Sequence, residues 1–117
     1  MNPYLNKEKS PCLKIDVFIS SWITLDAIID TGFAGGISLP KKYQKFFKNK
    51  TPLTVQRFLL ADGSTKLYPI FEIKIKYKGK VKFLYLVFSG DEALVGIEFL
   101  LGFKFVLDLK KFEVSLE

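Results

Sequence analysis

Apolar and polar residues alternate along most of the chain, which is the pattern of strands that turn one face toward a core. Asp62-Gly63 separates two of these segments, and an Asp-Gly dipeptide in that position is typical of a hairpin turn. Lys78-Gly79 predicts another hairpin turn in the same way. We therefore expect strands at residues 13–19, 22–31, 37–40, 54–60, 66–77, 80–88, 105–109 and 112–116.

Helical spacing is scarce by comparison. Residues 41–48 would place Tyr43, Phe46 and Phe47 on one side of a helix, and residues 93–103 combine a strand end with a short helix. Strands dominate and turns recur at short intervals, so the chain predicts a mainly β fold: a small closed β-barrel with one short C-terminal helix. Residues 1–12 are expected to form an N-terminal arm, and residues 13–117 a single domain.

Composition narrows the class of protein further. The chain has 117 residues, 49% of them hydrophobic, which fits one globular domain with a substantial core. It has no histidine and a single cysteine, Cys12, so it offers neither an internal disulfide nor a Cys-His zinc site, and we expect no metal and no cofactor. No apolar run reaches the length of a membrane span, and the polar start lacks the apolar region of a secretory signal. We expect a cytoplasmic protein without a membrane partner.

The charge is strongly basic, with a formal net value of +6, and seventeen of the eighteen basic residues are lysine. Lys74, Lys76 and Lys78 occupy alternate positions of one predicted strand, which is typical of a solvated sheet face. Specific nucleic-acid readers favour arginine for bidentate contacts, so no nucleic-acid partner is expected. A basic β-barrel that binds RNA through its lysine face is the alternative, and strong salt dependence of binding would support it.

The candidate chemistry lies in Asp30-Thr31-Gly32. The aliphatic residues at 27–29 run straight into Asp30, which places this acid at the end of a core strand. An ordinary turn aspartate is the alternative interpretation, because Asp, Thr and Gly are all common in turns. Asp26 would face the same side of the strand by the period of two, and we expect it to have a structural role near the exposed start of that strand.

Three stretches in this order resemble the retropepsin-like aspartic proteases, the single-domain relatives of pepsin. They are residues 27–32, the hairpin turn at residues 61–64, and Ala93-Leu94-Val95-Gly96, and the resemblance extends over about residues 13–116. Viral members usually carry arginine after the last of these glycines, where this chain has Ile97, so the chain looks more like the cellular, prokaryote-like members. The resemblance implies a retropepsin-like barrel that acts as a homodimer, because each chain supplies one catalytic acid.

The resemblance also implies a mechanism and a set of roles. Two symmetry-related Asp30 carboxylates share one proton and activate a water that attacks the peptide bond of an extended or unfolded polypeptide, a behaviour for which aspartic proteases are the established example. Thr31 and Gly32 complete the catalytic loop. The residues implied to contact substrate are Phe33, Ala34 and Gly35 of that loop, Ala61, Asp62, Gly63 and Ser64 of a flap, and Ile97. A catalytically silent module for dimerisation or peptide binding is the alternative within the same fold.

Overall fold

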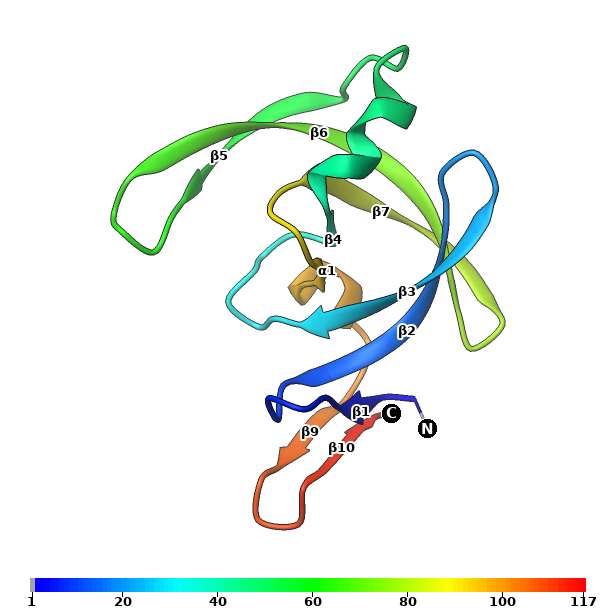
Figure 1. The fold of residues 1–117 in the computed structure, drawn as a ribbon, viewed down its shortest axis with the longest axis vertical. Helices are drawn as coiled ribbons and strands as arrows, with labels where there is room; N and C mark the ends of the chain where they lie inside the picture. The colour runs from blue at the N-terminus through cyan, green and yellow to red at the C-terminus, as the bar shows by residue number, and fades with distance from the viewer. Residues whose placement is uncertain (1) are drawn as a thin grey trace.

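A closed barrel of six strands forms the body of the protein (Figure 1). The structure is a computed structural model, and it describes residues 2–117. Around the barrel the order is β2–β3–β8–β4–β7–β6, and β6 closes the circle by pairing with β2 at Asp16–Lys76 and Val17–Ile75. The mainly β closed barrel predicted from the sequence is thereby confirmed. The barrel strands are β2 (Pro11–Phe18), β3 (Trp22–Ile29), β4 (Ile37–Leu39), β6 (Thr65–Tyr77), β7 (Lys80–Phe88) and β8 (Ala93–Val95).

The remaining elements include two edge strands, a separate hairpin and a short helix. Strand β1 (Tyr4–Leu5) pairs with the edge of β2, and β2 begins at Pro11, ahead of the boundary expected after residue 12. Strand β5 (Thr54–Leu59) pairs with β6, while β9 (Phe105–Asp108) and β10 (Glu113–Leu116) form a separate hairpin. The helix α1 (Ile97–Leu100) is the short C-terminal helix that the sequence predicts.

Alternation along the strands fills the core. In β2, Leu13, Ile15 and Val17 are at most 1% exposed, and the residues between them face outward. Such one-sided burial is the main source of stability in a half-buried sheet, because each buried aliphatic side chain contributes about 1.5–3 kcal/mol. The Lys78-Gly79 turn has positive φ at both residues, 49° and 77°, which suits a tight hairpin.

The segment Lys41–Phe47 forms a 3₁₀ helix, η1, instead of an α-helix. With three residues per turn, Phe47 points about a third of a turn away from Tyr43 and Phe46. The prediction that all three side chains share one face is therefore wrong. Phe47 enters the core, where its ring packs edge-on against Phe71 and Phe88, whereas Phe46 is 44% exposed.

The β5–β6 hairpin projects beyond the barrel. Figure 1 shows it on the same side of the molecule as the loop that joins β3 to β4, drawn in cyan. Strand β5 is almost wholly exposed, and the residues of β6 from Ile70 onward carry the side chains that enter the core. The projecting hairpin and the β3–β4 loop therefore border one region of the surface, and that region contains Asp30.

Candidate active site

Asp30 is the first residue after β3, one residue beyond the strand end. Its backbone N–H donates to the carbonyl oxygen of Val95 at 2.9 Å, which continues the parallel pairing of β3 with β8. Its Oδ1 accepts the N–H of Gly32 at 2.9 Å, and its carbonyl oxygen accepts the N–H of Phe33 at 3.1 Å. The predicted strand extended to Thr31, but the chain turns here, so Asp30 is half-buried while Thr31 and Gly32 are exposed.

Backbone hydrogen bonds from Gly96 and the two residues after it hold the Asp30 loop in place. The N–H of Gly96 donates to Gly36 at 3.0 Å, that of Ile97 to Phe33 at 2.9 Å, and that of Glu98 to Gly35 at 3.2 Å. A Cβ on Gly96 would lie closer than 3.0 Å to the carbonyl oxygens of both Phe33 and Gly35. Glycine is needed at this position because two backbone segments approach each other directly.

A cavity of about 350 Å³ opens at Asp30. Its walls come from the Asp30 loop, from β4, β7 and β8, and from the β5–β6 hairpin, so the hairpin covers the acid. The lining residues are Asp30, Gly32, Phe33, Ala34, Ser38, Phe58, Leu59, Leu60, Tyr68, Val87, Ser89 and Leu94.

A neighbouring cavity of about 260 Å³ lies on the other side of the Phe33–Phe58 pair. The two cavities share Phe33, Ala34, Phe58 and Val87. The second cavity adds Gly35, Gly36, Gln56, Ile70, Tyr85 and Glu98. Together they form a mostly apolar depression that contains the carboxylates of Asp30 and Glu98. Such a depression could accommodate several neighbouring side chains of one extended ligand.

Aromatic contacts join the hairpin to the Asp30 loop. The ring of Phe58 lies 6.2 Å from that of Phe33 and packs edge-on against Tyr68 at 5.5 Å. Sequence reasoning missed Phe58 and Tyr68, because it placed the hairpin's contacts at its tip. The sequence did offer one signal for these residues, since both are aromatic and lie on the two strands that flank the Asp62-Gly63 turn.

The hairpin tip itself lies outside both cavities. Asp62 Oδ1 accepts the N–H of Ser64 at 2.9 Å and its hydroxyl at 2.5 Å, and Gly63 has φ +86°. These hydrogen bonds from Ser64 lower the pKa of the Asp62 carboxyl. Ala61 is exposed as well, so the structure of the single chain brings none of residues 61–64 against Asp30.

Ile97 also lies outside the cavities. Its side chain is 39% exposed, and its backbone contact with Phe33 is what connects it to the loop. Of the loop residues expected to contact substrate, Phe33 and Ala34 line both cavities, and Gly35 lines the second.

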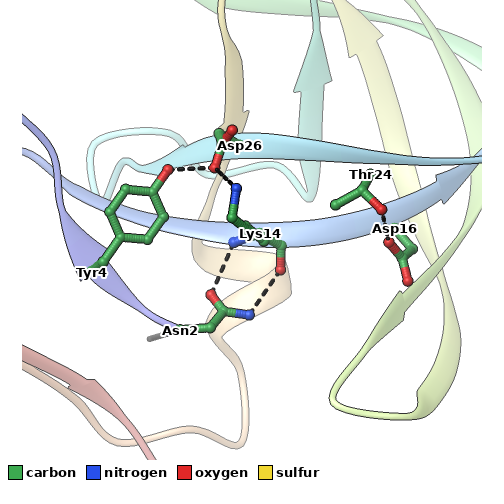
Figure 2. A network of polar contacts seen from close by, with 6 residues as sticks. All are labelled: Asn2, Tyr4, Lys14, Asp16, Thr24 and Asp26. Carbon is green, nitrogen blue, oxygen red and sulfur yellow. Dashed lines mark hydrogen bonds and ion pairs between the residues drawn. The ribbon is translucent and has the colours of Figure 1, made fainter.

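Asp26 belongs to a separate polar network in the second half of β3, and not at the start of the strand where the sequence placed it (Figure 2). Its Oδ1 accepts the Tyr4 hydroxyl at 2.5 Å and Lys14 Nζ at 2.9 Å. The hydrogen bond from Tyr4, followed by that from Lys14, lowers the pKa of the Asp26 carboxyl. Burial and the bond to Asp26 raise the pKa of Tyr4. These contacts tie β1 to the barrel, which agrees with the structural role expected for Asp26.

Within residues 2–117, no three side chains of His, Cys, Asp or Glu gather closely enough to hold a metal ion. None of the helices in the same range has the length and hydrophobicity needed to cross a bilayer.

Comparison with solved structures identifies the fold. The chain is similar to the crystal structure of a retropepsin-like aspartic protease from Rickettsia conorii, with a TM-score of 0.71 and 21% sequence identity over 97% of this chain and 86% of that chain. It is also similar to the solution structure of the Simian Foamy Virus (mac) protease, with a TM-score of 0.53 and 17% identity over 73% of this chain and 86% of that one. No model of a known protein family matches the sequence, and no curated protein does.

The chain therefore has the retropepsin-like fold, as the order of its three sequence motifs predicted. In this fold Asp30 stands directly after β3, hydrogen-bonded to Val95 of β8, in a cavity that the β5–β6 hairpin helps to line.

Proposed function

We propose that this chain is the subunit of a homodimeric aspartic endopeptidase that uses Asp30 as its catalytic acid. The observation that supports it most directly is the position of Asp30, at the end of a barrel strand and in a cavity covered by a projecting hairpin. Both solved structures compared above are described as proteases. The chain has no histidine that could activate a serine or cysteine nucleophile, so hydrolysis by an activated water fits its composition.

The second carboxylate is supplied by a second copy. Thr31 and Gly32 are exposed beside Asp30, so a twofold axis next to this loop brings two Asp30 side chains together without unfolding either barrel. The two acids share one proton because both cannot be charged at contact distance. The ionised one removes a proton from water, and the protonated one donates to the carbonyl oxygen of the scissile amide.

The β5–β6 hairpin acts as the cover of the site. A polypeptide in an extended conformation lies between this hairpin and the Asp30 loop, and its main chain pairs with the exposed backbone there. Phe58 and Tyr68 close over it and exclude water from the reacting groups. Side chains of the substrate enter the two cavities that meet at Phe33.

Replacement of Asp30 by Asn tests this proposal. Cleavage of an unfolded test protein should fall by at least about a hundredfold, while sedimentation shows the same dimer as the parent. Asp26→Asn is the matched control, because it removes a carboxylate from the same strand segment outside the cavities, and it should cleave normally. If Asp30→Asn cleaves as fast as the parent, Asp30 is not the catalytic acid. If the parent binds peptide without cleaving it, the chain is a catalytically silent peptide-binding module and not an enzyme.

A further inference from the structure

The second cavity contains one acidic side chain, Glu98, whose carboxylate is held in place. Its Oε1 accepts the backbone N–H of Tyr85 at 3.1 Å, and its own N–H donates to the carbonyl oxygen of Gly35. Gly36 lies so close to Glu98 Oε1 that a Cβ on residue 36 would collide with this oxygen. The carboxylate is thus fixed between β7 and the catalytic loop, at the wall of the cavity.

No cation within residues 2–117 forms an ion pair with this carboxylate. Among residues 2–117, the one ion pair within 4.0 Å joins Lys14 to Asp26. Burial lowers the pKa of Lys82, and the nearby charge of Glu98 partly offsets this. The Lys82 Nζ, however, donates to the carbonyl oxygen of Phe99 at 3.2 Å and lies 4.6 Å from the centre of the Phe99 ring. Glu98 therefore interacts with Lys82 without forming an ion pair, and its carboxylate remains available at the wall of the cavity.

The other walls of the cavity fit the rest of a basic side chain. Phe58, Ile70 and Val87 offer apolar surface against which a methylene stem packs. Phe58 and Tyr85 are also aromatic, and an aromatic face attracts a cation. A carboxylate only accepts hydrogen bonds, so the complementary ligand group carries several N–H donors. A lysine or arginine side chain meets all three conditions, because it joins an apolar methylene stem to a cationic group with several N–H donors.

We infer that Glu98 is a specificity-determining residue, and that the second cavity takes a lysine or arginine side chain of the polypeptide substrate. The two cavities share Phe33 and Phe58, so a peptide with its scissile bond at Asp30 has a neighbouring side chain within reach of Glu98. The inference rests on the proposed function for the reaction at Asp30, whereas the preference for positive charge is a property of the second cavity alone.

Matched peptides test the inference. In each member of the set, one position around the cleavage site carries lysine, norleucine or glutamate, and the other positions are held constant. The parent should cleave the best lysine peptide about tenfold more efficiently than its norleucine counterpart, since a charge-assisted hydrogen bond contributes roughly that factor. Glu98→Gln keeps an oxygen for the N–H of Tyr85 but removes the charge. It should abolish the preference, which is measured as the ratio of kcat/KM for the lysine peptide to kcat/KM for the norleucine peptide.

Glu72→Gln is the control, because Glu72 is exposed on β6 and lines neither cavity. It should leave the preference intact. Glu98→Lys should favour the glutamate peptide, and thermal denaturation checks that both Glu98 variants are folded. If the parent cleaves all three peptides equally, or if Glu98→Gln keeps the lysine preference, the inference is wrong although the enzyme assignment stands.

A binding experiment separates the inference from the proposed function. Fluorescence anisotropy measures binding of the same labelled peptides to Asp30→Asn, with and without Glu98→Gln. Tighter binding of the lysine peptide that depends on Glu98 supports the inference even if the parent cleaves nothing, an outcome that overturns only the enzyme. Absence of both cleavage and charge preference overturns both.

Discussion

Gly96→Ala is expected to destabilise the fold at the point where the end of β8 supports the Asp30 loop. Gly96 has φ −114°, a conformation that alanine adopts readily, so the effect comes from packing alone. The added Cβ would lie closer than 3.0 Å to the carbonyl oxygens of Phe33 and Gly35. Both are backbone atoms, and both accept hydrogen bonds from the residues that follow Gly96.

The magnitude follows from these contacts. Overpacking at a closed site costs about 1–3 kcal/mol, and each weakened hydrogen bond costs about 1 kcal/mol. With the Ile97–Phe33 and Glu98–Gly35 bonds both affected, the free energy of unfolding should fall by about 3–5 kcal/mol. For a domain of this size that is a fall in Tm of roughly 10–20 °C. Displacement of the loop should also remove activity, because Asp30 moves with it.

Urea denaturation at a fixed protein concentration measures the loss, and Gly35→Ala is the matched control. A Cβ at Gly35 meets the Phe33 ring at 2.7 Å, but a side chain can rotate away, so this variant should lose no more than about 1 kcal/mol. Equal midpoints for Gly96→Ala and Gly35→Ala would refute the idea that close backbone approach determines the residue at position 96.

Three further predictions concern the site and its surroundings. Peptidase activity should peak at acidic pH and decline toward neutrality, because the paired acids must retain one proton; a pH–rate profile that still rises above about pH 7 contradicts this. Asp26→Asn should lower the free energy of unfolding at neutral pH by less than about 1 kcal/mol, since the Asp26 side chain is 57% exposed. The pKa of Asp26 is lowered in the folded state, so the charged carboxylate stabilises the fold fully above its unfolded pKa of about 4, and this stabilisation is lost as the pH falls. Urea titrations should therefore show a lower free energy of unfolding for Asp26→Asn than for the parent at about pH 7, and no difference at about pH 2. Phe58→Ala should raise KM for peptides about tenfold with little change in Tm, because it removes the contact between hairpin and loop but no core side chain; an unchanged KM would show that the contact does not hold substrate.

Local patterns in the sequence predicted most of the strands. Alternation identified β2 and β7 closely, and Asp62-Gly63 and Lys78-Gly79 lie at the hairpin turns as expected. These features depend on residues close together in sequence, where period and turn chemistry act directly. The closure of the barrel by β2 and β6 could not be predicted from alternation, because residues about 60 positions apart pair there without a local signal.

The candidate site divides in the same way. The position of Asp30 at a strand end could be predicted, because the aliphatic run before it is local. The residues that cover it could not, since Phe58 and Tyr68 reach the cavity only through the register and curvature of the β5–β6 hairpin. The contact of Glu98 with Tyr85 is also invisible in the sequence, because thirteen positions and a change of element separate the two residues.

Strand β6 links two regions of unequal protection against solvent. Its residues from Phe71 to Tyr77 pair within the barrel, whereas residues 65–69 pair with β5 alone and contribute no buried side chain to the core. Amide hydrogens in the first part should exchange with deuterium only on global unfolding, and those in the second part through brief local openings. Continuous backbone thus connects a well-protected base to an arm that should open more readily than the barrel.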